Sequence, residues 1–386
     1  MDEYQKIISS LLRGKALRTP FVISDEEDNY FESLQEKLKE YRRRLNSLKT
    51  DGPISDWVRC NIDAFDSINS LLLRALEEYL TGNAGKAYDR IEELMGCDLI
   101  KTNLVKLKTP LDHINDNHNN SKSLYRVRCS DHPLTKREDI FHIPFEKRHL
   151  VDTQRFSIAG LPCLYLGSSL YVCWQEMGKP DLNKMYLSHY KINSQNNHDG
   201  VNVLDFAYSF ETLKLEGLEE FIVLGEGESK EKLISYLALW PILLACSFSK
   251  QAENSRFNVE YVIPNLILQW IGKEKRPVSG IRYFSTKTAH LRNSDVGINY
   301  VFPPSSLELK KKGFCQSLSR SFVFSRPVSW QMLEAIDIQS KITNYERFDR
   351  TDNLEEQLVK KYKSTQFYAM ERKLIDILCC EKIEHT

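Results

Sequence analysis

The spacing of hydrophobic residues predicts that the first part of the chain is helical. Between residues 31 and 49, apolar side chains recur every three or four positions among charges of both signs, as on the buried face of an amphipathic helix. A second helix is predicted from Ser55, which can cap its start, to near Gly82, and a third from Asn83 to Met95. Together they indicate a small helical bundle.

The pattern changes after the polar loop at residues 112–123. Short apolar or alternating runs, typical of strands, are mixed with helix-like stretches and show no regular strand–helix alternation. This arrangement indicates an α+β domain. The predicted strands are 124–127, 163–166, 185–190, 201–206, 281–284 and 298–302, and the predicted helices are 168–177, 230–248 and 259–272.

The last 80 or so residues carry a further strand at 321–324 and helices at 330–336 and 354–378, after a basic run at Lys310, Lys311 and Lys312. We therefore expect three parts. An N-terminal helical domain would span residues 1–112, an α+β domain 120–305, and a C-terminal extension of strand and helix, packed on that core, 306–386.

Composition narrows the classes of function. Lys+Arg and Asp+Glu both number 53, so the formal net charge is zero, whereas a dedicated nucleic-acid binder would carry a basic excess. The longest apolar run, 237–246, is too short to span a bilayer, and the amino terminus lacks the features of a signal peptide. Nine cysteines without a CxxC pair fit reduced thiols in a cytoplasm, so a cytoplasmic protein with no membrane contact is expected.

Four residues in one stretch carry chemistry that suits a phosphorylated ligand. Arg126 and Arg155 offer guanidinium groups whose planar forks match a pyrophosphate. Tyr165 lies in a strand whose alternation turns it away from Leu164 and Leu166, and Glu176 ends an otherwise apolar helix. Each also has a structural interpretation, namely an exposed arginine, a core aromatic and a solvated helix-end carboxylate.

Other patterns support no further site. His113 and His118 are five residues apart in a loop that adds no cysteine or carboxylate cluster, so no metal site is predicted. The glycines at 225 and 227 match neither nucleotide-binding fingerprint. No His/Asp pair at recognisable spacing supports a serine nucleophile.

Four segments in order resemble the RES-domain family, which is named for a shared arginine, glutamate and serine. They are Tyr125-Arg126, Gln154-Arg155-Phe156, Leu164 to Ser169 and Gln175-Glu176, followed by GIRYFST at 280–286 and GINYVFPP at 297–304. The resemblance covers roughly residues 124–302. It implies an ADP-ribosyltransferase-like RES core of short strands and helices, and a toxin that acts on NAD+ as its substrate rather than as a cofactor.

The resemblance also assigns roles. It implies that Arg155, Tyr165 and Glu176 are catalytic and that Arg126 and Ser285 bind the substrate, without a metal. Ser285 alternatively satisfies a backbone group at a strand end. The helices before residue 112 are similar to HEPN-like domains fused to RES domains but lack the Arg-x4-6-His motif of HEPN ribonucleases, so a regulatory or oligomerising role is expected.

These expectations define the leading hypothesis and its alternatives. We expect an NAD+ glycohydrolase or phosphorylase that cleaves the nicotinamide–ribose bond, acting as a bacterial toxin or defence effector held in check by an antitoxin or a regulatory protein. The first alternative is ADP-ribosyl transfer to a protein. The second, of another class, is a non-catalytic module that binds NAD+ or a partner.

Overall fold

A computed structural model of the chain divides it into two compact units that are each discontinuous in sequence. Unit 1 comprises residues 1–108, 153–158 and 208–270, and unit 2 comprises 109–152, 159–207 and 271–386. The residues that the structure describes are 3–23, 30–48, 51–111, 123–193, 200–207, 210, 226–250, 257–273, 275–287, 294–336 and 361–382. The expected boundary loop at 112–123 lies outside them except for Ser123, and the division at 112 and 305 stays a prediction.

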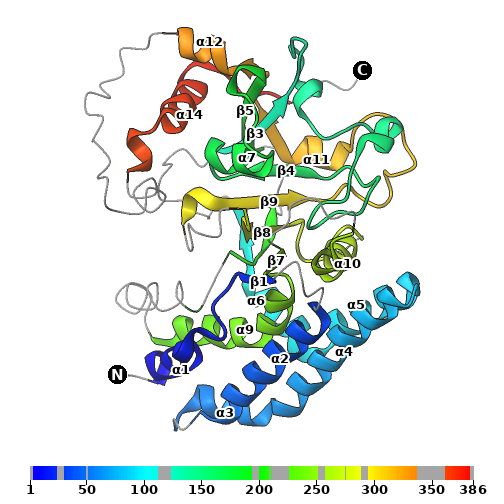
Figure 1. The fold of residues 1–386 in the computed structure, drawn as a ribbon, viewed down its shortest axis with the longest axis vertical. Coiled ribbons are helices and arrows are strands. Elements are labelled where there is room, and N and C mark those ends of the chain that lie inside the picture. Colours follow the sequence, from blue (N-terminus) through cyan, green and yellow to red (C-terminus); the bar gives the residue numbers. More distant parts are fainter. Residues whose placement is uncertain are drawn as a thin grey trace. The chain divides into compact units, whose positions relative to one another are not determined.

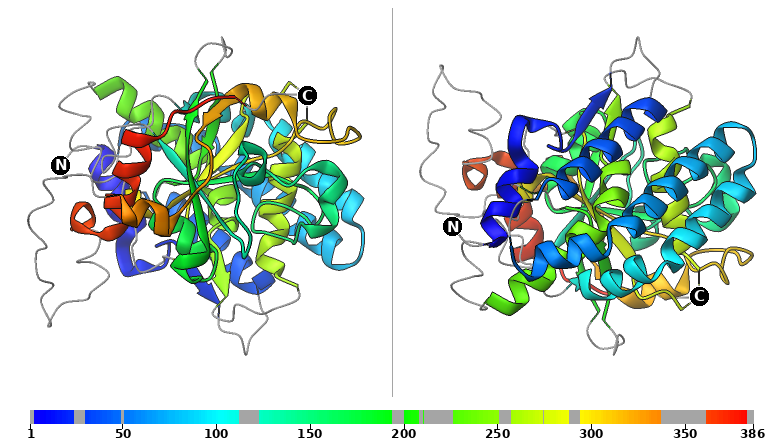
Figure 2. Two further views of the ribbon diagram at one scale, coloured as in Figure 1. Left: turned by 90° about the horizontal axis from the view of Figure 1, so that it is seen from above. Right: turned by 90° about the horizontal axis from the view of Figure 1, so that it is seen from below.

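Unit 1 is mainly helical. Its helices are α1 (Glu3–Leu12), α2 (Tyr30–Asn46), α3 (Pro53–Cys60), α4 (Ile62–Leu80), α5 (Ala84–Gly96), α6 (Asp98–Leu107), α9 (Glu226–Ala245) and α10 (Val262–Ile271). A short parallel pair joins β1 (Phe21–Ile23) to β7 (Phe248–Lys250). Helices α2, α4 and α5 run side by side in Figure 1 and in the right-hand view of Figure 2.

Aromatic residues with bonded hydroxyl groups organise the core of unit 1. Tyr41 of α2 packs against Phe65 of α4 and Trp240 of α9, and its hydroxyl donates to the carbonyl of Leu237 at 2.7 Å. Burial of a tyrosine ring is favourable when its hydroxyl group keeps a hydrogen-bond partner, and the carbonyl of Leu237 is that partner here. Burial raises the pKa of Tyr41 well above its ordinary value.

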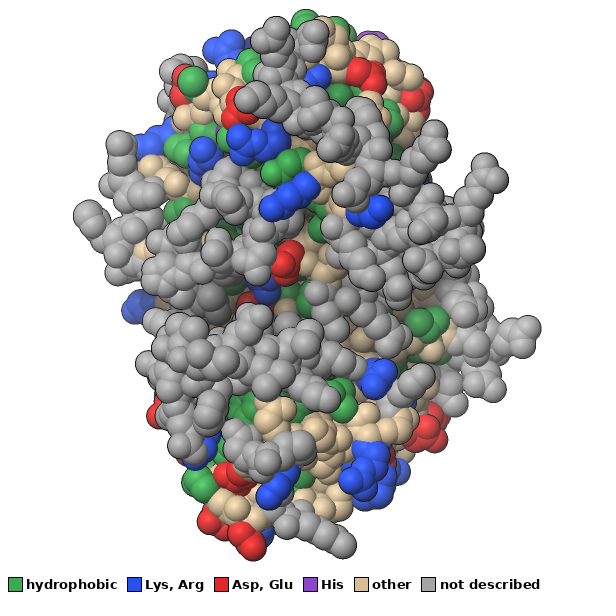
Figure 3. All heavy atoms as spheres, turned by 90° about the vertical axis from the view of Figure 1, so that its left-hand side faces the viewer, with side chains coloured by type: hydrophobic (Ala, Val, Ile, Leu, Met, Phe, Trp, Pro, Cys, Tyr) green, Lys and Arg blue, Asp and Glu red, His purple; other side chains and the backbone are tan. Residues whose placement is uncertain are grey.

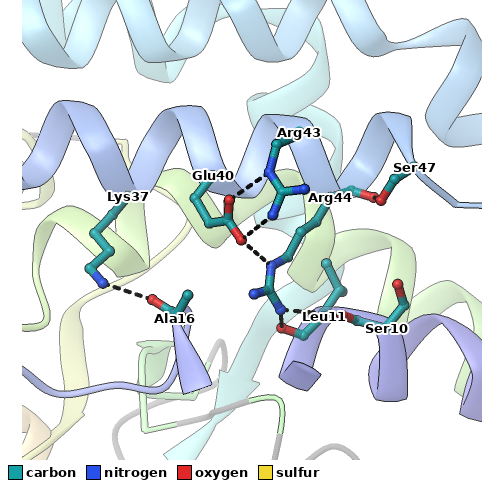
Figure 4. A network of polar contacts seen from close by, with 8 residues as sticks. All are labelled: Ser10, Leu11, Ala16, Lys37, Glu40, Arg43, Arg44 and Ser47. Atoms are coloured by element: carbon teal, nitrogen blue, oxygen red, sulfur yellow. Dashed lines mark hydrogen bonds and ion pairs between the residues drawn. The ribbon is translucent and has the colours of Figure 1, made fainter. Parts of the chain in front are cut away.

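A polar network fixes α2 against the end of α1 (Figure 4). Arg44 is buried, and its Nη1 donates to the carbonyls of Ser10 and Leu11, which the end of α1 leaves without helical partners. Its Nε donates to Glu40 at 2.6 Å, and Arg43 holds the same carboxylate from the other side. Hydrogen bonds from these two arginines lower the pKa of Glu40 to about 2.

Unit 2 is built around a mixed sheet. The strands that form it in the described part of the chain are β2 (Lys108–Pro110), β3 (Leu124–Cys129), β4 (Leu164–Gly167), β5 (Met185–Ile192), β6 (Asn202–Asp205), β8 (Gly280–Phe284), β9 (Ile298–Phe302), β10 (Phe322–Phe324) and β11 (Val328–Ser329). Their order is β10-β5-β3-β4-β9-β8-β6-β2, with β11 also paired with β5. Strand β6 runs parallel to β8, whereas β10, β5, β3, β4, β9 and β8 are antiparallel to their neighbours in that order.

Alternation along the strands gives the sheet two buried faces. Leu124, Leu164 and Leu166 belong to one hydrophobic cluster, whereas Tyr125 belongs to a second cluster that includes Leu170 of helix α7. Successive strand residues point to opposite faces, so this division follows from the period of two. The face that carries Tyr125 is covered by α7 (Leu170–Glu176), α12 (Trp330–Ala335) and α14 (Gln366–Ile377). The described residues of unit 2 also form helix α11 (Gln316–Ser321).

The expected fold class, α+β, is confirmed: N-terminal helices accompany a central mixed sheet and a C-terminal helix. The predicted helix from Ser55 to near Gly82 is wrong as a single element, because it breaks at Asn61 into α3 and α4. Of the helix predicted at 354–378, residues 354–360 lie outside the described residues. The described part, 361–378, contains α14. Across the described residues, no helix is long and apolar enough to cross a membrane.

Helix α7 packs tightly against the sheet at Gly167, and replacement of this glycine tests the packing. A Cβ at this position would lie 2.6 Å from both Cys173 Sγ and Val172 Cγ1. We expect Gly167→Ala to lower the free energy of unfolding by about 1–3 kcal/mol through overpacking, measured by urea denaturation. Gly85→Ala in α5 is the control, since a Cβ there meets nothing within 4 Å. Equal stability of parent and Gly167→Ala would contradict the packing.

The Glu40 network predicts a pH-dependent contribution to stability. The pKa of Glu40 falls from 4.5 to about 2 on folding, so its stabilisation is present above pH 4.5 and is lost as the pH falls towards 2. Because this carboxylate is partly solvated, we expect Glu40→Gln to cost only about 1 kcal/mol at pH 7 and less at pH 3. Urea unfolding at both values checks this, with Glu77→Gln, an exposed site on α4, as control. A deficit that is independent of pH would contradict it.

Candidate functional site

Helix α7 is attached to the sheet by the serines that precede it. Ser169 caps the helix by accepting from the amide of Val172, and its hydroxyl donates to the carbonyl of Val296 at 2.6 Å. Ser168 donates to the carbonyl of Asp295 and accepts from the amide of Ile298, so the start of α7 is tied to the start of β9. The Leu-Gly-Ser-Ser sequence therefore sets where the helix begins and which way it runs.

Glu176, the last residue of α7, is the centre of a polar cluster. Ser285 Oγ and Asn299 Nδ2 both donate to its Oε1, each at 2.6 Å. Ser285 and Asn299 are only 2% and 5% exposed, whereas Glu176 is half-buried. Lys287 Nζ donates to the backbone carbonyl of Glu176 at 3.0 Å. The carboxylate is therefore fixed by two neutral donors on one oxygen, and within the described ranges nothing donates to Oε2.

The sheet register explains why these residues meet. Ser285 directly follows β8, and Asn299 is the second residue of β9. In the antiparallel β8–β9 pair, Tyr283 lies opposite Asn299, so Ser285 emerges beside it at the end of the ladder. Asn299 also lies opposite Gly167 of β4. Residues directly opposite each other share a face, and this is the face on which α7 packs.

Tyr165 lies on the same face of the sheet as Asn299. It precedes Gly167 by two positions and is half-buried, whereas Leu164 and Leu166 are buried on the opposite face. Since Gly167 is directly opposite Asn299, Tyr165 is a diagonal neighbour of Asn299. The side chain of Tyr165 therefore shares a surface with the cluster around Glu176, as its alternation predicts.

Arg126 lies in β3, directly after Tyr125, the described position at which β3 pairs with Gly167 of β4. Its Nη1 donates to the backbone carbonyl of Tyr165 at 2.7 Å, and burial lowers its pKa. Its Nε is buried without a hydrogen-bond partner in the described structure. A buried guanidinium with a donor to spare can bind an anionic group at little further cost in desolvation.

Arg155 falls in unit 1, whereas the other four candidates fall in unit 2. It is 7% exposed, and its Nη1 donates to the carbonyls of Cys246 and Phe248 at 3.3 and 2.6 Å. Its guanidinium also lies 4.9 Å from the ring centre of Tyr261, a cation–π distance. These contacts hold the end of α9 and strand β7, and a role in binding phosphate stays a prediction.

Asn299 is the residue of this cluster that sequence reasoning missed. The GINYVFPP segment predicts a strand at 298–302 and assigns its asparagine no role. An amide in a strand of otherwise hydrophobic residues was the available signal, because a buried amide needs partners. Among the described residues, no group of three or more His, Cys, Asp or Glu side chains could hold a metal ion.

Unit 2 is thus an α+β protein core that presents one fixed carboxylate at the end of a short helix. A Bacillus subtilis (strain 168) protein named "Putative toxin YopC" is 30% identical over 314 residues, which are 81% of this chain and 67% of the relative. The chain belongs to the same family as this protein. No protein-family model matches the chain. No solved structure matches it either.

Replacing Asn299 by aspartate tests the bond to Glu176. Asn299→Asp would bring two carboxyl groups to about the 2.6 Å that now separates Nδ2 and Oε1, and they could not both be ionised. We expect a loss of about 1–3 kcal/mol in the free energy of unfolding at pH 7.5, partly regained at pH 5 when the pair shares a proton. Urea denaturation measures it, and Asn83→Asp at an exposed position is the control. An equal effect at both pH values would contradict the contact.

Proposed function

We propose that the protein is an NAD+-degrading enzyme that cleaves the nicotinamide–ribose bond, and that Glu176 is its central catalytic residue. The observation that carries this proposal is the state of the carboxylate: Ser285 and Asn299 saturate Oε1, and Oε2 accepts no hydrogen bond from the described residues. A half-buried carboxylate with one oxygen fixed and one available is suited to face a developing positive charge.

The chemistry of the bond explains why a single carboxylate suffices. When the glycosidic bond breaks, its electron pair leaves with the pyridinium nitrogen, which becomes neutral nicotinamide, so no general acid is needed. The ribose carbon becomes oxocarbenium-like, and a nearby carboxylate stabilises it or binds the 2′-hydroxyl. Water then adds to that carbon and releases a proton to the solvent, or phosphate adds through one of its anionic oxygens without losing a proton. In this scheme Ser285 and Asn299 position Glu176 and do not react.

The remaining candidates supply binding. Tyr165, on the same face of the sheet, would stack on the nicotinamide or the adjacent ribose. Strand alternation places Arg126 on the opposite face from Tyr165, so its role as a phosphate ligand is proposed on its spare donor and the resemblance to the RES-domain family. Arg155 is proposed as a second phosphate ligand on the resemblance to the RES-domain family alone. NAD+ is thus a substrate, and the scheme uses no metal.

The name of the Bacillus subtilis relative supports a toxic activity in cells. Loss of NAD+ would starve the cell of its main hydride carrier, so we propose that an antitoxin, or the helices of unit 1, holds the enzyme in check. The face drawn in Figure 3 carries described basic and acidic side chains together, and the formal net charge is zero. Nucleic acid is therefore not the proposed substrate.

Nicotinamide release by the purified protein tests the proposal. We expect Glu176→Gln to lower kcat by about 10²–10³-fold, because the amide keeps the shape and loses the charge that faces the transition state. Glu334→Gln, an exposed carboxylate of unit 2, is the matched control and should retain full activity. Adding phosphate identifies the acceptor by the product formed.

Each alternative gives a different result in this assay. Release of nicotinamide only when a target protein is added would indicate ADP-ribosyl transfer to that protein. Binding of NAD+ without any release, in the parent and in Glu176→Gln alike, would indicate a non-catalytic module and overturn the proposal.

A further inference from the structure

The helix that carries Glu176 is held at its other end by a carboxyl group from the C-terminal part of the chain. Glu371 of α14 accepts the backbone N–H of Leu170, the first residue of α7, at 2.7 Å on Oε1. The same oxygen accepts the hydroxyl of Tyr362 at 2.6 Å. The amide of Leu170 is one of the N–H groups that a helix start leaves without an internal partner, so Glu371 completes this end of α7.

Helix α14 packs on α7 through a cluster of aromatic side chains. The ring of Phe367 lies 5.5 Å from that of Tyr171 and 5.4 Å from that of Trp174, both on α7, and 5.4 Å from that of Trp330 on α12. The bond from Glu371 is therefore not an isolated contact. It is the polar centre of a packed interface between the C-terminal segment and the helix of the candidate site.

The surroundings of Glu371 favour the neutral acid. Its side chain is 1% exposed, and its Oε2 is buried with no hydrogen-bond partner in the described structure. Burial raises the pKa of Glu371 to about 8. The titratable groups that face it are Tyr362, whose pKa burial raises well above its ordinary value, and Cys173 of α7, whose pKa burial raises to about 12. Tyr125 of β3 interacts electrostatically with Tyr362, and Arg126 and Glu176 interact electrostatically with Cys173.

Both ends of α7 are therefore fixed by side chains from other elements. A seven-residue helix is only about 10 Å long, so a shift at Leu170 is carried to Glu176 almost undiminished. An ionised Glu371 would bury a charge inside this interface that the two hydrogen bonds on Oε1 compensate only in part. The interface could relieve that charge by letting water reach Glu371, which would loosen the start of α7.

We propose that Glu371 is a positioning residue for Glu176, that it holds α7 in place as the neutral acid, and that its ionisation releases the helix and lowers activity. The predicted loss of activity rests on the proposed function, whereas the predicted release of helix α7 does not. This positioning role makes Glu371 and the side chains of α14 that pack on α7, such as Phe367, part of the machinery that sets the geometry of the site.

Kinetics of nicotinamide release across pH 6–9.5 test the kinetic consequence. We expect the parent's kcat to fall with a midpoint near pH 8, matching the pKa of about 8 for Glu371. Glu371→Gln keeps an acceptor for Leu170 and cannot ionise, so it should retain at least about a third of the kcat at pH 7 and lose the alkaline fall. Glu371→Ala should lower kcat at least about tenfold with KM little changed. Asp376→Asn, exposed on the same helix, is the control.

Hydrogen exchange of the α7 amides tests the structural consequence without any assay of activity. We expect Glu371→Ala to speed exchange in 170–177 at least about tenfold, whereas Glu371→Gln and Asp376→Asn should leave it unchanged. Unchanged exchange in Glu371→Ala, or an identical alkaline fall in the parent and Glu371→Gln, would overturn the inference. If the parent releases no nicotinamide, the proposed function fails and the exchange data alone decide the role of Glu371.

Discussion

The candidate site depends on one interaction, the pair of 2.6 Å hydrogen bonds that Ser285 and Asn299 donate to Glu176. They join the end of a helix to two neighbouring strands, β8 and β9, and so fix a carboxylate over the sheet. The donors are neutral and nearly inaccessible to water, so the negative charge is oriented without being neutralised. A carboxylate held in this way keeps one oxygen available, which is what the proposed function requires of it.

The sequence predicted the elements around this interaction well. Alternation placed Leu164 and Leu166 on one face and Tyr165 on the other, and α7 begins and ends close to the predicted 168–177. The resemblance to the RES-domain family singled out both Glu176 and Ser285, and the structure shows that these two residues are in contact. These features are local or follow from a two-residue or 3.6-residue period, which a single sequence carries directly.

Features that depend on distant parts of the chain were not predictable in the same way. The bond between Glu371 and Leu170 joins residues 201 positions apart, and no local pattern marks either of them. The break between α3 and α4 was missed because the apolar spacing continues across Asn61. The contacts of Arg155 could not be predicted for the same reason, because its partners in unit 1, such as Phe248, lie far from it in sequence. Sequence identified these residue types, and only the fold identifies their partners.

The most direct test of the central claim is the NAD+ content of cells after induction of the parent and of Glu176→Gln, at matched protein levels. If the carboxylate acts on the glycosidic bond, the NAD+ pool should collapse with the parent and stay near its starting value with the variant. An equal fall in both, or no fall in either while the parent protein accumulates in folded form, would contradict the account.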